Sequence, residues 1–187
     1  RYCSATLTNV TISGNSTNES GGGIKIIGAS PILTNVTISN NTAGQYGGGI
    51  YVNESGSLPK ILNSILWNNT ANTAAGNTQE IFVLSGSVTA TYSDIKYGYE
   101  GTGNIDADPL FVDAANGDYR LSDYSPAIGT GTATGAPATD IEGNPRPNPA
   151  NTNPDMGAYE NALGTPLEQT MYYVSTSGST NGTGFSD

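Results

Sequence analysis

The sequence contains no histidine, a single cysteine and only 6 lysine and arginine residues among its 187 residues. Without histidine, the chain lacks the commonest general base and the commonest metal ligand of enzymes. Cys3 cannot form an internal disulfide bond, because it has no partner. The 16 acidic residues give a net charge of −10, which repels a phosphate backbone, so we expect no nucleic-acid partner. No apolar run reaches the ~18 residues of a membrane-spanning helix, so we also expect no membrane span.

Glycine, proline, asparagine, serine and threonine are abundant instead. The 25 glycines and 10 prolines, together with few helix-favouring side chains, predict many turns and short strands. The polar, acidic composition is typical of exported proteins, and we predict an extracellular or cell-surface location. The opening residues RYCSATLTNV show no signal peptide, so we expect any export signal to lie outside this sequence.

A repeat of 26 residues is the clearest feature of the first half. LTNVTISGN at 7–15 returns as LTNVTISNN at 33–41, and GGGI at 21–24 returns at 47–50. A third copy, ILNSILWNN, follows 28 residues later at 61–69, and SVTATYSDIKYG at 87–98 echoes it after about 30. Each repeat reads as a glycine-rich turn with a short strand, followed by a second strand rich in β-branched residues.

Repeats of this length without helices predict a parallel β-helix with coils of about 26 residues, stacked about 4.8 Å apart. Equivalent residues would then lie directly above one another. The expected columns are Ile24 with Ile50, Ile26 with Val52, Leu7 with Leu33 and Ile61, and Ile12 with Ile38 and Leu66. The predicted fold class is therefore all-β.

Asparagines also recur in register. One set is Asn9, Asn35 and Asn63, and the other is Asn15, Asn41 and Asn69. Stacked amides can donate to one neighbour and accept from the other, which satisfies polar groups at a bend. Several of these residues also match the glycosylation pattern N-x-[ST]. An inward ladder and a glycan exclude each other at the same side chain, and the sequence leaves both readings open.

The pattern SPILTNVTIS with GGGIY resembles the right-handed parallel β-helix repeats of polymorphic outer-membrane-like surface proteins. The ordered motifs DPLFVD, GDYRL, SPAI and DMGAYE at 108–160 resemble the C-terminal part of secreted β-helix proteins of the choice-of-anchor Q type. One departure is Gly129, which stands where family members carry aspartate. The resemblance implies β-helix coils over residues 1–100 and a capping segment of the same domain over 101–160. It also implies an extracellular protein without an assigned catalytic activity.

The capping segment would cover the open strand edges and apolar side chains of the last coil. Its apolar residues are Leu110, Phe111, Tyr119, Leu121, Tyr124 and Ile128. Arg120 and Arg146 are expected to pair with Asp108, Asp140, Asp155 or Glu160.

Catalysis is not expected. Hydrolases need two or three carboxylates facing one groove, and the repeating coils offer only Glu19 and Glu54, at equivalent N-E-S turns. The alternative function is a polysaccharide lyase-like enzyme or a carbohydrate-binding module. In that case Tyr46, Tyr51 and Trp67 would stack on a cell-surface polysaccharide.

No cofactor is expected, with a structural calcium ion as the alternative. Four aspartates lie near flexible Gly and Asn residues and offer the hard oxygen ligands that calcium prefers. They are Asp106, Asp108, Asp113 and Asp118, and they lack the spacing of an EF-hand.

After the family's terminal motif, a linker at 161–170 leads to MYYVSTSGSTNGTGFSD at 171–187. This last piece resembles the opening of a further β-helix unit. We therefore expect a tandem array, or a filament in which the strand of one copy packs onto the first coil of the next copy. The predicted assembly strand is Met171, Tyr172, Tyr173, Val174 and Ser175. The predicted partners are copies of the chain, arranged head to tail.

Overall fold

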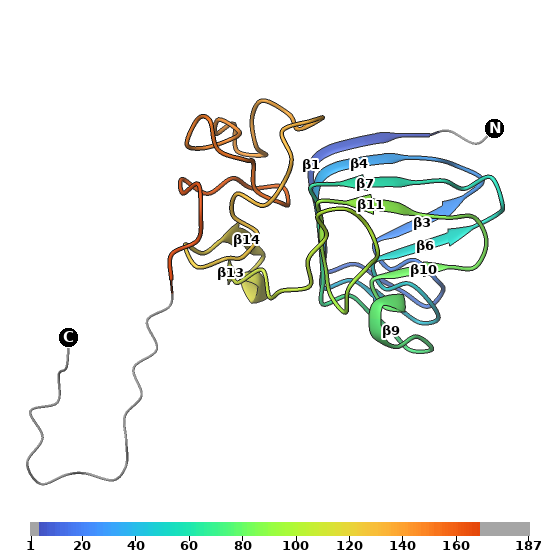
Figure 1. Ribbon diagram of the computed structural model, residues 1–187. Coiled ribbons are helices and arrows are strands. Elements are labelled where there is room, and N and C mark those ends of the chain that lie inside the picture. Colours follow the sequence, from blue (N-terminus) through green and yellow to red (C-terminus); the bar gives the residue numbers. More distant parts are fainter. Residues whose placement is uncertain (1–3, 169–187) are drawn as a thin grey trace, which may run out of the picture.

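The computed structural model describes residues 4–168 and contains almost only β-structure and turns (Figure 1). The chain winds into a parallel β-solenoid of about three turns. The first sheet contains β1 (Thr6–Ser13), β4 (Ile32–Ser39), β7 (Lys60–Leu62), β8 (Ile65–Trp67), β11 (Thr89–Thr91) and β12 (Asp94–Ile95). The second contains β3 (Ile24–Ile27), β6 (Ile50–Asn53) and β10 (Ile81–Val83), and the third contains β2 (Ser16–Thr17), β5 (Thr42–Ala43) and β9 (Thr70–Ala71). Outside the solenoid, β13 (Phe111–Asp113) and β14 (Asp118–Leu121) form an antiparallel pair. Two short 3-10 helices span Gly76–Thr78 and Ala114–Asn116.

The register of the parallel sheets confirms the predicted columns. Leu7 pairs with Leu33, which pairs with Ile61, and Ile24 pairs with Ile50. Residues that hydrogen-bond between successive coils are 26, then 28, then 29 residues apart. The spacing that was visible in the sequence is therefore the length of one coil.

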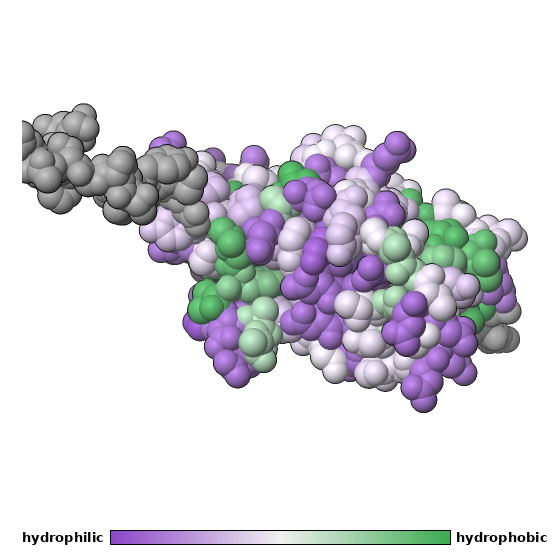
Figure 2. All heavy atoms as spheres, turned by 90° about the horizontal axis from the view of Figure 1, so that it is seen from below, coloured by the Kyte–Doolittle hydropathy of each residue, from purple (hydrophilic) through white to green (hydrophobic). Residues whose placement is uncertain are grey.

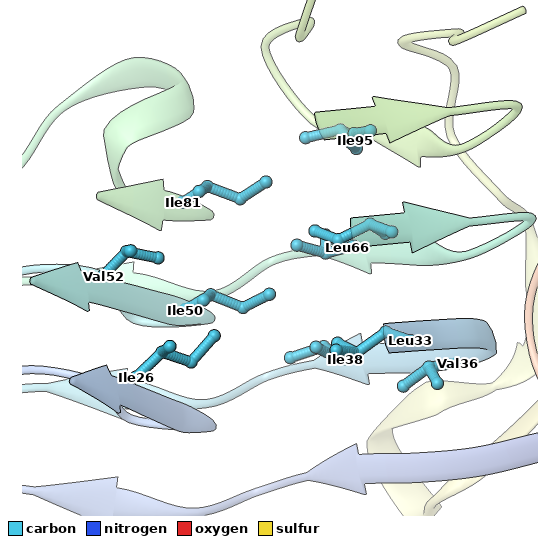
Figure 3. Packing of buried hydrophobic residues seen from close by; sticks show 11 residues of the cluster. Ile26, Leu33, Val36, Ile38, Ile50, Val52, Leu66, Ile81 and Ile95 are labelled. Carbon is cyan, nitrogen blue, oxygen red and sulfur yellow. The ribbon is translucent and has the colours of Figure 1, made fainter. Parts of the chain in front are cut away.

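The core lies between the first and second sheets. Figure 3 shows Ile50 below Ile81 in one column and Ile26 below Val52 in the next, facing Leu66 and the other apolar side chains of the first sheet. Most of these side chains are fully buried. Each coil thus contributes one layer to a continuous apolar interior, which a single coil could not enclose alone.

The repeated GGG motif is explained by close approach between neighbouring turns. A Cβ atom at Gly23 would lie 2.7 Å from the carbonyl oxygen of Gly49 and 3.2 Å from the side-chain nitrogen of Asn41. At Gly49 it would lie 2.5 Å from the carbonyl oxygen of Glu80 and 3.1 Å from the side-chain nitrogen of Asn69. Only glycine leaves room there for the next coil and the buried asparagines.

At two bends of each coil the backbone is left-handed, and most of the residues at these positions are asparagines. The first column has φ values of 53° at Asn9, 53° at Asn35, 48° at Asn63 and 49° at Tyr92. The second has 67° at Gly14, 57° at Asn40 and 59° at Asn68. Asparagine and glycine adopt this conformation more readily than other residues, which explains why they recur at each coil.

Residues 106–168, which we call the lateral segment, do not cover the last coil as an end cap. Figure 1 shows this part, in yellow to red, beside the stack of strands. Ile65 and Trp67 of the solenoid share a buried cluster with Leu121, Ile128 and Met156 of the lateral segment. Of the apolar residues expected to close the end, Leu121, Ile128 and the partly buried Phe111 therefore pack against a side of the solenoid, at β8, whereas Tyr124 is 45% exposed. No helix in residues 4–168 is long and apolar enough to cross a membrane.

Candidate functional site

The two ends of the solenoid differ in how their strand edges are paired. Among the described residues, β1 pairs only with β4, β2 only with β5, and β3 only with β6. Within residues 4–168, all three strands of the first coil therefore have one edge of backbone N–H and C=O groups without a strand partner. We call this edge the open end.

The opposite end is closed over the first sheet by residues 99–105. The N–H of Ile105 donates to the carbonyl of Ser93 at 3.0 Å, and its carbonyl accepts from the N–H of Ile95 at 3.0 Å. The side-chain nitrogen of Asn104 donates to the carbonyls of Ala90 and Tyr99, both at 3.0 Å. Figure 2 views the molecule from this end and shows hydrophilic residues between separate apolar patches.

A ladder of asparagines, exposed at Asn15 and buried at Asn41 and Asn69, runs between the two ends. The side-chain nitrogen of Asn15 donates to the side-chain oxygen of Asn41 at 3.0 Å, and Asn41 donates in the same way to Asn69 at 2.9 Å. Asn69 donates in turn to a carboxylate oxygen of Glu80 at 2.5 Å. The predicted ladder is thus confirmed for this set. Glu80 ends it with a group that only accepts when ionised.

Glu80 and Asp94 are fully buried acids near the closed end. Burial raises the pKa of Glu80 to about 7, against the hydrogen bonds from Asn69, which favour the carboxylate. Burial, together with the nearby carboxylates of Asp106 and Asp108, raises the pKa of Asp94 to about 8. One oxygen of Asp94 accepts from the N–H of Ala107 at 3.2 Å, and the other has no hydrogen-bond partner among residues 4–168. Both acids therefore change charge near neutral pH.

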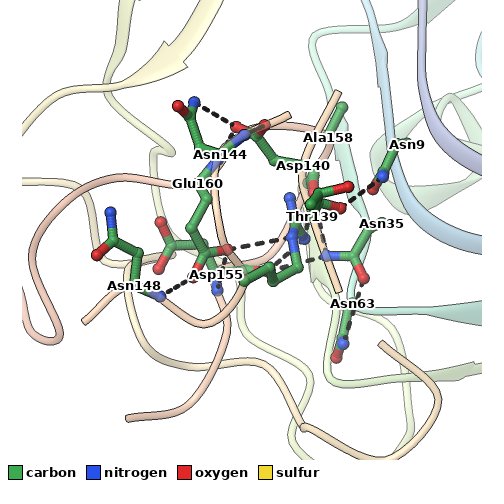
Figure 4. Close-up of polar contacts among 12 residues, drawn as sticks. Asn9, Asn35, Asn63, Thr139, Asp140, Asn144, Asn148, Asp155, Ala158 and Glu160 are labelled. Atoms are coloured by element: carbon green, nitrogen blue, oxygen red, sulfur yellow. Dashed lines mark hydrogen bonds and ion pairs between the residues drawn. The ribbon is translucent and has the colours of Figure 1, made fainter. Parts of the chain in front are cut away.

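The other set of asparagines, Asn9, Asn35 and Asn63, attaches the lateral segment to three successive coils (Figure 4). Asn9 donates to the carbonyl of Thr139 at 2.7 Å, and Asn63 donates to the carbonyl of Thr132 at 2.8 Å. Between them, Asn35 donates to the carbonyls of Asp155 at 3.0 Å and Gly157 at 3.1 Å. These amides turn outward and bind backbone carbonyls of the lateral segment. The side-chain nitrogen of Asn63 also donates to the side-chain oxygen of Asn35 at 3.5 Å. The two asparagine columns thus have different uses.

A buried arginine organises the lateral segment next to this contact. Arg146 donates to the same carbonyls as Asn35, those of Asp155 and Gly157. Its Nε lies 3.2 Å from a carboxylate oxygen of Glu160, as an ion pair whose N–H does not point at that oxygen. Burial raises the pKa of Glu160, and the charge of Arg146 lowers it. Removal of either partner would leave the other charge buried and uncompensated. The expected pairing of Arg146 is confirmed, whereas Arg120 pairs with Asp118 instead.

Each of the four aspartates predicted as calcium ligands has a structural contact. Asp106 accepts from the N–H of Tyr97, Asp108 from that of Leu110, Asp113 from that of Asn116, and Asp118 from Arg120. Asp113 and Asp118 lie opposite each other in the β13–β14 pair. Within residues 4–168, no group of three or more Asp, Glu, His or Cys side chains is placed to hold a metal ion. Calcium binding stays a prediction that these contacts do not favour.

The three aromatic residues predicted to contact sugar do not share one surface. Tyr46 and Tyr51 both stack on Phe82, with ring centroids 4.4 and 6.0 Å apart. Of the two tyrosines, Tyr46 is 37% exposed and Tyr51 is 8% exposed. Trp67 lies on the first sheet instead, buried under the lateral segment and near Lys96. A polysaccharide partner stays a prediction, with Tyr46 as its most accessible ring.

The predicted assembly strand, Met171 to Ser175, lies outside the described residues. The structure therefore describes the surface onto which such a strand would add, and not the strand itself. Comparisons with protein families, with curated proteins and with solved structures find no match for this chain. What the fold defines is a parallel β-solenoid whose first coil has no further strand partner within residues 4–168.

Sequence reasoning missed Glu80, Asp94 and Asn104, which complete the closed end. Glu80 follows Asn69 by 11 residues instead of one coil, so the repeat gave no sign that it continues the ladder. Asn104 likewise follows Ser93 by 11 residues and accepts from its N–H at 3.0 Å.

Proposed function

We propose that this chain is an extracellular structural and adhesive subunit whose copies assemble head to tail into a filament or surface layer. The proposal places it with the secreted β-helix proteins of the choice-of-anchor Q type, supported by the motif order from DPLFVD to DMGAYE. Filament assembly is supported by the open end. A contact between unlike surfaces that does not close on itself propagates from copy to copy.

The outer edge of β1, which pairs with no other strand within residues 4–168, is the observation that supports assembly most directly. Soluble β-proteins usually protect edge strands with charges, proline, bulges or short length. β1 is eight residues long, and its sequence TLTNVTIS contains no charged residue and no proline. Its edge is therefore a template for a further parallel strand, as in known modes of strand addition.

The closed end favours a donated strand over direct stacking of coils. Residues 99–105 occupy the position that the next coil would take beneath β11 and β12. The last coil of one molecule therefore cannot pair with the first coil of another through the first sheet. A separate extended segment meets no such obstacle.

The test compares the full chain with a chain that ends at Glu168, by sedimentation velocity and negative-stain electron microscopy. We expect concentration-dependent polymers from the full chain only. Far-UV circular dichroism should show the same β-signal for both, since the solenoid lies within residues 4–168. A full-length chain that remains monomeric at high concentration would contradict the proposed function.

A further inference from the structure

The contact between the lateral segment and the coils encloses an unequal set of charges. Three acids, Asp140, Asp155 and Glu160, are buried there together with one cation, Arg146. We call these four residues the charge cluster. The coil side chains that bond to this part of the lateral segment, among the described residues, are the neutral Asn9, Asn35, Thr37 and Asn63. With every group ionised, three carboxylates and one guanidinium would leave a net charge of −2 in the interior, which is unfavourable.

Asp140 is the acid of the cluster that favours its ionised form. Burial raises its pKa, but the side chain of Asn144 and the backbone N–H groups of Glu160, Asn144 and Glu142 donate to its two oxygens. On balance the pKa of Asp140 lies below its usual value. Its carboxylate therefore offsets the single positive charge of Arg146, and the other two acids have no further cation in the cluster.

The remaining two acids favour their protonated forms. Burial, together with the nearby carboxylate of Glu160, raises the pKa of Asp155 to about 7, against the hydrogen bonds from the N–H groups of Asn161 and Gly129 and the charge of Arg146. Burial raises the pKa of Glu160 as well. The cluster therefore retains a proton at pH values at which a solvated carboxyl group has already lost it.

Asp155 also begins the stretch that attaches the lateral segment to the coils, residues 155–158. Its carbonyl accepts from the side-chain nitrogen of Asn35 at 3.0 Å, and the N–H of Gly157 donates to the carbonyl of Asn63 at 2.8 Å. Figure 4 shows Asp155 and Glu160 next to these contacts. A change of charge in the cluster therefore acts on the residues that hold the two parts of the molecule together.

We propose that the docking of residues 155–158 on the coils is linked to proton uptake by the charge cluster, so that the contact is tightest in acid and weakens as the pH rises to neutral. This regulation goes beyond the proposed assembly and does not depend on it. When the contact opens, Met156 separates from Ile65 and Trp67, with which it shares a buried cluster. Opening therefore exposes apolar surface of the first sheet.

The docked and released states differ in the pH at which Asp155 loses its proton. In the released state the carboxyl group has its ordinary pKa of 3.8, whereas in the docked state the pKa is about 7. Between these two values only the docked state binds the proton, so docking weakens about tenfold for each pH unit. Docking should be strongest near pH ~4, where Asp140 is still ionised, and should change no further above pH ~7.

Amide hydrogen exchange of the full-length chain, followed by mass spectrometry from about pH 4.5 to about pH 8, tests this linkage. After correction for the intrinsic pH dependence of exchange, the opening constant of peptides that cover residues 155–158 should rise about tenfold per pH unit and level off near pH ~7. An opening constant that stays the same from pH ~4.5 to pH ~7 would overturn the proposal. It would also fail if peptides from β4 opened equally at every pH, because residues 155–158 would then be released only by unfolding of the whole solenoid.

Matched variants assign the slope to the charge cluster. Asp155→Asn removes the titrating group and should lower the slope by about one proton; the slope is the readout, because asparagine also offers one acceptor fewer to the N–H groups of Asn161 and Gly129. Glu160→Gln is the second variant and should also flatten the slope. Glu142→Gln changes an exposed acid of the same segment and should keep the slope of the unmodified chain. Equal slopes in all three variants would overturn the role of the cluster.

Discussion

Replacing Asn41 by alanine should destabilise the solenoid more than any exposed asparagine would. Asn41 is 0% exposed and lies at the centre of the asparagine ladder. Its side-chain nitrogen donates to the carbonyl of Ile12 at 2.8 Å and to the side-chain oxygen of Asn69 at 2.9 Å. Its side-chain oxygen accepts from both the backbone and the side chain of Asn15 at 3.0 Å. Alanine removes all of these contacts at once.

The size of the effect follows from which groups lose their partner. Asn15 is exposed, so water can replace its bonds. The oxygen of Asn69 still accepts from the backbone N–H at position 41 at 3.0 Å. The carbonyl of Ile12 is half-buried and loses a donor. With a net ~1 kcal/mol for each lost bond and up to ~3 kcal/mol for a buried unsatisfied group, we expect a loss of about 3 kcal/mol in the free energy of unfolding.

Thermal unfolding followed by circular dichroism measures this loss. For a domain of this size, 3 kcal/mol corresponds to a decrease in Tm of about 6–12 °C. Asn18→Ala, on an exposed residue of the first coil, is the control and should change Tm very little. If Asn41→Ala changed Tm no more than Asn18→Ala does, the ladder would not stabilise the solenoid and the reasoning would be refuted.

An aspartate at the same position separates hydrogen bonding from shape. Asn41→Asp keeps the volume of the side chain but replaces the donor nitrogen by an oxygen. At pH 7 the carboxylate would face the oxygen of Asn69 and the carbonyl of Ile12, which are both acceptors. We expect it to be at least as destabilising as Asn41→Ala at pH 7, and less so at pH 4, where the added carboxyl group is protonated.

Three further predictions concern the buried acids, the close-packed glycines and the lateral segment. Burial raises the pKa of Glu80 from 4.5 in the unfolded chain to about 7, so the folded state binds the proton more tightly. The free energy of unfolding should therefore be highest below pH ~4.5 for this group and fall by about 3 kcal/mol as the pH rises through 7; urea titrations at several pH values should show this slope, and Glu80→Gln should reduce it. Gly49→Ala brings a Cβ atom against backbone and should cost about 2 kcal/mol in chemical unfolding, whereas Gly56→Ala, where nothing lies within 4 Å, should be nearly neutral; equal losses would contradict the packing argument. Arg146→Met leaves the buried Glu160 carboxylate without its cation and should cost about 3–5 kcal/mol, seen as faster proteolysis of residues 106–168; unchanged proteolysis would show that the ion pair does not hold the segment.

The repeat made the architecture of the solenoid predictable. Residues such as Leu7, Leu33 and Ile61 recur at the length of one coil, and a side chain placed at a constant interval in a stack meets the same neighbours each time. The ladder of Asn15, Asn41 and Asn69 was predictable for the same reason.

Contacts between unlike parts of the chain were decided only by the tertiary structure. Asn35 binds the carbonyls of Asp155 and Gly157, which are 120 and 122 residues away, and no interval in the sequence indicates this pairing. The same holds for Glu80, which ends the ladder out of period. The sequence by itself determined which residues stack, because stacking depends on spacing alone. The structure decided that residues 106–168 pack against a side of the solenoid, because that depends on how two different surfaces match in space.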